Sequence, residues 1–154
     1  FLNRCLSDRF CIETKGKINV TLSPQNLLSC EFMNLECSMG SLPFWAWGFM
    51  QETGITTLEC VPYVSGKTSQ MNYKKTQRHQ KIGDGYVPSC TDSTQSCPGG
   101  GEFKLYKASN YTQVGDFWDP ARHVESIMRA LLQGPVDATF NGKNKRFQSL
   151  SITY

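Results

Sequence analysis

Residues 22–30 read Leu22-Ser23-Pro24-Gln25-Asn26-Leu27-Leu28-Ser29-Cys30, and they contain the start of a short helix. A hydroxyl side chain followed by proline is a strong helix start. The hydroxyl caps a free backbone N–H, and proline fits the first helical position. Ser23 and Pro24 supply this pair, so we expect a helix from Pro24 to about Cys30.

Two further helices are expected on either side of this one. Before it, Leu2, Cys5 and Leu6 have helical spacing that continues through residues 9–12, and Gly16 ends the helix. After it, a helix should begin near Pro43 and end at Gly54, with glycine at the C′ position. That helix carries an aromatic and apolar stripe, made of Phe44, Trp47 and Met50 with Trp45 and Phe49 beside them. Burial in a helical core explains the stripe better than a sugar-stacking surface does.

The second half of the chain has a different pattern. Residues 64–101 are rich in Ser, Gly, Thr, Lys and Gln and predict a long loop region held by cysteines. Strands are expected at Phe103–Lys107, Tyr111–Val114 and Val136–Phe140, with a short one near Ile152. Between them a helix starts at Asp119-Pro120 and stops at Gly134-Pro135, with one apolar face made of Val124, Ile127, Met128, Leu131 and Leu132. The order of these elements predicts an α+β fold.

The composition is that of an ordinary globular domain, with 39% hydrophobic and 19% charged residues in 154. The net charge is only +3. Two loose basic clusters, Lys74–Lys81 and Lys143–Arg146, belong to no nucleic-acid recognition module, so solvated loops explain them better. The longest apolar run, Pro43–Met50, is too short to span a bilayer. We therefore expect no nucleic-acid partner and no membrane span.

Seven cysteines are many for this length: Cys5, Cys11, Cys30, Cys37, Cys60, Cys90 and Cys97. None forms a Cys-x-x-Cys pair, and the only histidines are His79 and His123. Disulfides in an oxidising compartment therefore explain the cysteines better than a zinc site, and no metal or other cofactor is expected. The sequons that begin at Asn19 and Asn110 agree with that compartment and predict N-glycosylation.

Five segments, in order along the chain, resemble the papain family of cysteine peptidases, and its cathepsin B branch in particular. They match the end of the family's central helix, its second helix, its Cys-Asn-Gly-Gly segment with the helix after it, its Cys-x-Pro-Tyr signature, and the strand that lines its cleft. The segments are Ser7–Ile12, Leu22–Cys30, Cys37 with Gly40, Pro43 and Ala46-Trp47, Gly54-Ile55 with Cys60-Val61-Pro62-Tyr63, and Gly134–Phe140. The resemblance covers nearly the whole chain.

The resemblance implies a papain-like two-domain cysteine peptidase fold, with a helical left domain and part of a β-barrel-like right domain, truncated at both ends. Residues 1–63 would be the helical portion, 64–101 a disulfide-held loop region, and 102–154 part of the right domain. In the family, a cysteine thiolate at the N-terminus of the central helix attacks the peptide carbonyl with the help of a histidine. By the same match the cysteine would lie before Phe1 and the histidine after Tyr154. This chain alone is therefore expected to be inactive.

Several binding and disulfide positions carry over from the family. Gly40 falls in the segment that hydrogen-bonds the substrate backbone, although here that segment is one residue longer and has a single glycine. Pro43 and Thr139 match positions that line the S2 pocket. The family's pairing implies the disulfides Cys30–Cys90 and Cys60–Cys97. It leaves Cys11 and Cys37 without partners in this chain, and Cys5 is interpreted as a buried thiol.

Two functions remain open. The favoured one is a lysosomal, vacuolar or extracellular cysteine-type peptidase that cleaves peptides or proteins. Between Cys60 and Cys90 there is no other cysteine and only His79, so the occluding loop of cathepsin B is not expected and the enzyme would act mainly as an endopeptidase. The alternative is a non-catalytic secreted relative that keeps the fold as an interaction module. The irregular glycine segment favours this alternative.

Overall fold

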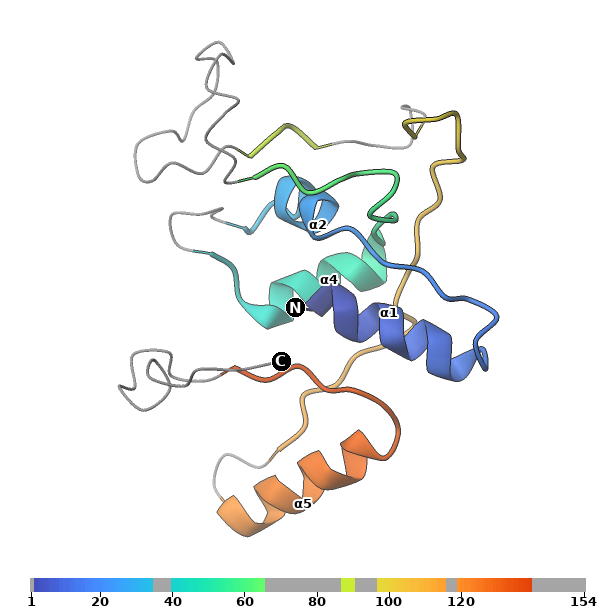
Figure 1. Ribbon diagram of the computed structural model, residues 1–154. Helices are drawn as coiled ribbons and strands as arrows, with labels where there is room; N and C mark the ends of the chain where they lie inside the picture. Colours follow the sequence, from blue (N-terminus) through green and yellow to red (C-terminus); the bar gives the residue numbers. More distant parts are fainter. Residues whose placement is uncertain (1, 35–39, 66–86, 91–96, 116–118, 140–154) are drawn as a thin grey trace, which may run out of the picture.

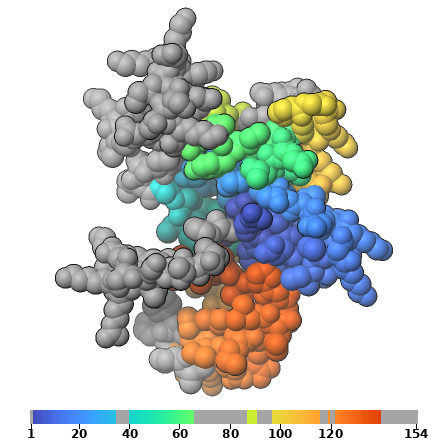
Figure 2. All heavy atoms as spheres, viewed as in Figure 1, coloured from blue at the N-terminus to red at the C-terminus, as the bar shows by residue number. Residues whose placement is uncertain are grey.

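The computed structural model describes residues 2–34, 40–65, 87–90, 97–115 and 119–139 (Figure 1). These residues form the helices α1 (Leu2–Glu13), α2 (Pro24–Cys30), α4 (Pro43–Glu52) and α5 (Pro120–Leu131). All four lie where the sequence predicts helices. Helices α1, α2 and α4 gather in one part of the molecule, and α5 lies apart from them (Figure 1), at the lower end of the space-filling view (Figure 2).

The predicted start of α2 is confirmed in detail. The Ser23 side chain accepts a hydrogen bond from the Asn26 N–H at 3.0 Å, and Pro24 occupies the first turn. The same hydroxyl donates to the carbonyl oxygen of Val61 at 2.6 Å. The Ser23 hydroxyl, which is fully buried, therefore both caps the helix and connects it to Val61, 38 residues later in the chain.

The end of α4 depends on Gly54. The N–H groups of Thr53 and Gly54 both donate to the carbonyl oxygen of Phe49, at 2.9 and 3.1 Å. Gly54 has φ +86°, and a Cβ there would lie 2.9 Å from the carbonyl oxygen of Tyr106. Glycine is therefore required both for the left-handed backbone and for the close approach of the chain at Tyr106.

The main hydrophobic core lies where α1 meets α4. Its buried members are Leu6, Leu22, Met50, Ile55 and Ala108. Phe10 of α1 adds an edge-on contact with Tyr106, with ring centroids 5.7 Å apart. Burial of these apolar side chains fixes α1 and α4 against each other and against the segment that contains Tyr106.

The aromatic stripe of α4 is only partly buried, which corrects the expectation from the sequence. Ala46 and Met50 are buried, but Phe44 is 60% exposed and Trp45 is 40% exposed. The helix is apolar on almost every side, and only one side can face α1. Met50 packs in the core with Leu6 of α1, Ala46 one turn earlier is buried as well, and the first turn keeps its large rings outside the core.

Two disulfides hold the loop region, and they are the same two pairs that the resemblance implies. Cys30 pairs with Cys90 and Cys60 pairs with Cys97, with Cα atoms 4.6 and 4.5 Å apart. The second pair is buried with Val61 and packs against Phe103, forming a small separate core. The loop region is therefore attached to α2 through Cys30 and to the segment after α4 through Cys60.

The predicted strands are wrong for the described residues. No strand forms at Phe103–Lys107, Tyr111–Val114 or Val136–Thr139, and the bridges Leu22–Thr57 and Ile55–Tyr106 are isolated. Ile55 and Tyr106 exchange both backbone hydrogen bonds, at 3.0 and 2.9 Å. Two residues later, however, the Ala108 N–H donates to the Met50 carbonyl oxygen of α4. A β-ladder continues only if successive N–H groups donate to the same partner strand. Here the next N–H group, that of Ala108, donates to α4 instead, so the ladder stops.

Gln25 holds the chain that leaves the Cys60 region. Its side-chain oxygen accepts hydrogen bonds from the N–H groups of Val64 and Ser65, both at 3.0 Å, and its amide donates to Ser29. Gln25 is only 1% exposed, Ser65 is buried and Val64 is half-buried, so water does not readily replace the Gln25 oxygen as acceptor.

Replacing Gln25 by leucine should therefore lower the free energy of unfolding by about 2–4 kcal/mol, the cost of leaving buried donors unpaired. Urea unfolding with the disulfides intact measures this. The matched control is Gln113→Leu, because Gln113 is exposed. Equal urea midpoints for the two variants would show that water reaches the Val64 and Ser65 donors.

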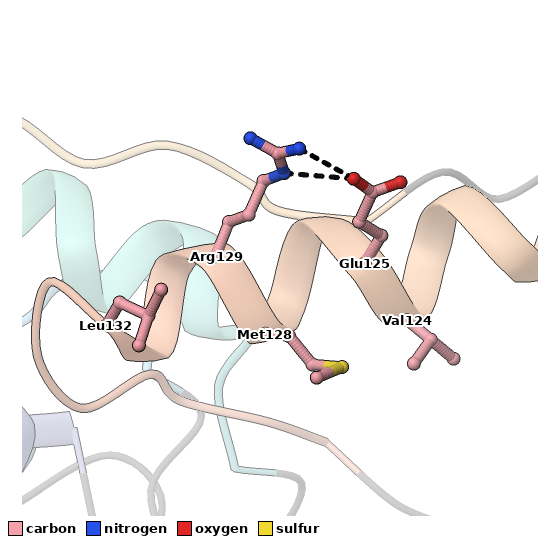
Figure 3. A pocket seen from close by; sticks show the side chains of 5 residues that line it. All are labelled: Val124, Glu125, Met128, Arg129 and Leu132. Atoms are coloured by element: carbon pink, nitrogen blue, oxygen red, sulfur yellow. Dashed lines mark hydrogen bonds and ion pairs between the residues drawn. The ribbon is translucent and has the colours of Figure 1, made fainter.

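Helix α5 has the predicted start and the predicted apolar face. The Asp119 carboxylate accepts from the Arg122 N–H at 3.2 Å, which caps the first turn. Figure 3 shows Val124, Met128 and Leu132 lining a surface depression together with the Glu125–Arg129 ion pair. The apolar side chains are more than half exposed, so the described residues leave this face largely uncovered.

Candidate functional site

The turn at Gly134-Pro135 is held against α1. The Pro135 carbonyl oxygen accepts two hydrogen bonds, from Cys5 Sγ at 3.1 Å and from Arg9 Nε at 2.9 Å. Cys5 and Arg9 are four residues apart and share one face of the helix. In Figure 1 the segment after Pro135 passes between α1 and α5. This contact fixes the segment that carries Thr139 relative to α1.

A buried carboxylate organises the chain before α4. Glu31 is 4% exposed, and its two oxygens accept from the Met33 N–H at 2.7 Å and from the Ser41 hydroxyl at 2.9 Å. Gly40 precedes Ser41, is exposed, and has φ +73° with open space on its Cβ side. The carboxylate thus ties the segment from Gly40 to Pro43 to the end of α2.

The predicted substrate positions lie on two separate segments. Gly40 and Pro43 stand at the entry to α4, exposed and half-buried respectively, and Thr139 is exposed on the segment after Pro135. No hydrogen bond among the described residues joins the two segments directly. Helix α1 is their common support, through the core on one side and Pro135 on the other.

Sequence reasoning missed two of the residues that position these segments. Arg9 could have been found, since its four-residue spacing from Cys5 places both on one helix face. Glu31 carried no such signal, because a glutamate just after a helix is usually solvated. Other predicted features lie outside the described residues: Cys37, His79, Ile152 and both basic clusters.

Cys5 is a structural thiol. It is 7% exposed, and burial raises the pKa of the Cys5 thiol, while the hydrogen bond and charge of Arg9 offset part of that effect. The thiol donates its hydrogen to the Pro135 carbonyl oxygen. A nucleophilic cysteine needs a lowered pKa and access to solvent, and Cys5 has neither.

Iodoacetamide at pH 8 should therefore alkylate Cys5 much more slowly than Cys11, the half-buried free cysteine at the other end of α1. Peptide mapping by mass spectrometry measures both rates, and urea-unfolded protein, in which the rates should converge, is the control. The free energy of unfolding should also fall as the pH rises above about 8.5, because the thiol ionises more readily in the unfolded chain. Cys5→Ala should remove that part of the pH dependence. Equal native rates would contradict a buried, neutral Cys5.

His123 also has a structural position. A Cβ at Gly115 would lie 2.6 Å from both Cε1 and Nδ1 of the His123 ring, so the imidazole packs directly on the glycine backbone. Neither of the free cysteines among the described residues, Cys5 or Cys11, hydrogen-bonds to it. The described part of the chain therefore contains no cysteine–histidine pair arranged for acyl transfer.

Neither a metal-binding cluster nor a membrane-spanning helix is found among the described residues. They contain no group of three or more His, Cys, Asp or Glu side chains that could hold a metal ion. No helix in these ranges is long and apolar enough to cross a membrane. Asn19 and Asn110, the two predicted glycosylation positions, are both exposed.

The sequence of the chain matches one protein family over nearly its whole length. Residues 3–152 match the papain family of cysteine proteases. Cathepsin B-like CP2 of Giardia intestinalis is 31% identical over 134 residues, which cover 86% of this chain and 36% of that protein. Cathepsin B-like cysteine proteinase 6 of Caenorhabditis elegans is 32% identical over 153 residues, covering 88% and 37%.

The name of a third relative does not mention a peptidase. Tubulointerstitial nephritis antigen-like of Rattus norvegicus is 29% identical over 133 residues, which cover 86% of this chain and 27% of that protein. The chain thus spans about a third of the length of the curated relatives it matches. Its match over residues 3–152 and its cathepsin B-like relatives show that it belongs to the papain family of cysteine proteases.

Proposed function

We propose that residues 1–154 form the central portion of a cathepsin B-like cysteine endopeptidase, and that they supply part of the wall of its substrate cleft. The attachment of the Pro135 carbonyl oxygen to α1, through Cys5 and Arg9, is the observation that carries the proposal. It supports a position of the segment that carries Thr139 beside α1, which would be the helix on which the family carries its nucleophile. The catalytic cysteine and histidine would belong to parts of the protein outside these residues.

The two-domain organisation is part of the same proposal. Residues 1–63 would belong to the helical domain, 64–101 to the disulfide-held loop region, and 102–154 to the second domain. The core between α1 and α4 and the separate position of α5 support two domains, whereas Tyr106 and Ala108, which pack in that core, are an exception to the boundary at residue 102. The two disulfides support passage through an oxidising compartment, and therefore a lysosomal, vacuolar or extracellular location.

The substrate would be an extended peptide held between the entry to α4 and the segment after Pro135. Gly40 would offer backbone to the peptide, while Pro43 and Thr139 would contact the side chain at P2. The absence of any cysteine between Cys60 and Cys90, with His79 as the single histidine there, supports cleavage within chains rather than removal of C-terminal dipeptides.

The experiment is a change of P2 preference in the full-length protein. Thr139→Glu places a carboxylate at the proposed S2 pocket, so kcat/KM for a substrate with arginine at P2 should rise about tenfold relative to one with phenylalanine. Gln113→Glu adds the same charge at an exposed position elsewhere and should leave the ratio unchanged. If Thr139→Glu also leaves it unchanged, Thr139 does not line the P2 site.

The second candidate is a non-catalytic interaction module. The tubulointerstitial nephritis antigen-like relative and the single glycine between residues 37 and 43 favour it. It would be favoured over the peptidase if the full-length protein turned over no dipeptidyl substrate and no cysteine in it reacted with a thiol-directed epoxide.

A further inference from the structure

An exposed group of aromatic rings lies where the first turns of α4 meet Tyr111. The aromatic patch consists of Phe44, Trp45, Trp47 and Tyr111. Phe44 meets Trp45 and Tyr111 edge-on, with ring centroids 5.3 and 5.8 Å apart, and Trp47 stacks on Tyr111 at 6.5 Å. Phe44 and Trp45 are 60% and 40% exposed, whereas Trp47 and Tyr111 are half-buried. Adjoining exposed rings of this size usually indicate a surface that something covers.

Asn110 borders this patch in the sequence, because it directly precedes Tyr111. It is exposed, and the ring of the next residue, Tyr111, belongs to the patch. The Tyr111 N–H donates to Asn110 Oδ1 at 2.8 Å, which fixes the orientation of the side-chain amide. Thr112, also exposed, completes an Asn-x-Thr acceptor for N-glycosylation.

A sugar is the chemical class that this border favours. One face of a pyranose ring presents C–H bonds with partial positive charge, and an aromatic ring presents a negative face. A sugar joined to Asn110 would start one residue away from Tyr111, whose ring centroid is 5.8 Å from that of Phe44. Covalent attachment makes the local concentration of that sugar high, so weak stacking suffices to hold it.

We propose that Asn110 carries an N-linked glycan whose first N-acetylhexosamine stacks on the aromatic patch and covers it. In the attachment, Asn110 Nδ2 bonds to the anomeric carbon of a polyprenyl-diphosphate-linked oligosaccharide. The bond from that carbon to the diphosphate breaks, the lipid diphosphate leaves, and the amide loses a proton to the transferase. The inference rests on the proposed passage through the secretory pathway and is independent of peptidase activity.

Asn19 offers an internal comparison. It is exposed and has its own sequon, but it lies between α1 and α2, and its neighbour Val20 packs against the core. No aromatic pair of the described residues involves residues 17–21. A glycan at Asn19 would therefore extend into solvent, whereas one at Asn110 would stack on the patch.

The test compares variants of the whole protein secreted from cultured animal cells. Thr112→Ala removes the Asn110 sequon, Thr112→Ser keeps it, and Asn19→Gln removes the other one. Mass spectrometry gives occupancy, and acrylamide quenching reports how far tryptophans are shielded. Asn110 should be occupied in the parent and in Thr112→Ser. Thr112→Ala alone should increase quenching and lower the Tm by about 2–4 °C. In a Trp45→Ala background, Thr112→Ala should have a smaller effect.

Enzymatic treatment of the folded parent protein covers the case in which Thr112→Ala does not fold. Trimming to the first N-acetylhexosamine should leave quenching unchanged, and removing that last sugar should increase it. The inference is overturned if Asn110 is unoccupied while Asn19 is occupied. It is also overturned if removing the last sugar leaves acrylamide quenching unchanged. If neither position is occupied, the inference fails together with the secretory location. A peptidase assay on the same samples separates either result from the proposed activity.

Discussion

The chain of residues 1–154, folded with both disulfides closed, is expected to cleave no dipeptidyl fluorogenic substrate above the buffer rate. A papain-type thiolate needs a histidine that shares its proton and donors that stabilise the oxyanion. Cys5 instead donates its thiol hydrogen to Pro135, and His123 packs on Gly115. Loss of a nucleophile or its base costs about 10⁶-fold in kcat in a comparable triad. The remaining binding surface cannot compensate for that.

A thiol-directed epoxide and a continuous fluorescence assay measure this directly. A papain-family enzyme assayed in parallel shows that substrate and probe are competent, and Cys5→Ser identifies any label carried by Cys5. Turnover that the epoxide abolishes, with the label on Cys5, would mean that α1 carries the nucleophile at a position different from the one argued above.

Loss of the Cys60–Cys97 disulfide should give the largest loss of stability available from a pair of side chains. Replacing both cysteines by serine opens a loop with a sequence separation of 37 and should lower the free energy of unfolding by about 3–4 kcal/mol. The bond also lies in a small core with Val61 and Phe103, so two hydroxyls would take its place in an apolar setting.

Urea unfolding of the double serine variant measures the loss. Cys11→Ser, which changes a free, half-buried thiol, is the matched control and should shift the midpoint far less. The Cys30–Cys90 pair closes a loop with a sequence separation of 60, and its loss should cost slightly more in chain entropy and less in packing. If the Cys60, Cys97 variant unfolds at the same urea concentration as Cys11→Ser, the bond does not hold the loop region.

The helices were predictable because their signals are local. Ser23 with Pro24, Pro43 with Gly54, and Asp119 with Pro120 each place a cap or a breaker within a turn of the helix end. The energies involved come from backbone groups close in sequence. The disulfide pairs, by contrast, came from the family resemblance, since seven cysteines leave many pairings open on sequence alone.

The strands were not predictable, because the competing partner is far away in the chain. The β-like pattern of residues 103–107 is real at Tyr106, which pairs with Ile55. Whether the ladder continues depends on where the next donor finds an acceptor, and Ala108 finds it at the end of α4. Strand propensity describes a side chain on a pleated surface and contains no information about that choice.

Local patterns in the sequence were enough to predict where the helices begin and end, that disulfides would hold the chain, and which family the chain resembles. Packing between distant segments set two further features: the thiol of Cys5 and the guanidinium of Arg9 share the Pro135 carbonyl, and Phe44 and Trp45 stay outside the core. Cys5 and Arg9 are separated from Pro135 by 130 and 126 residues. A contact of that kind forms only when packing brings two segments together, because neither segment has a local energetic preference for the other.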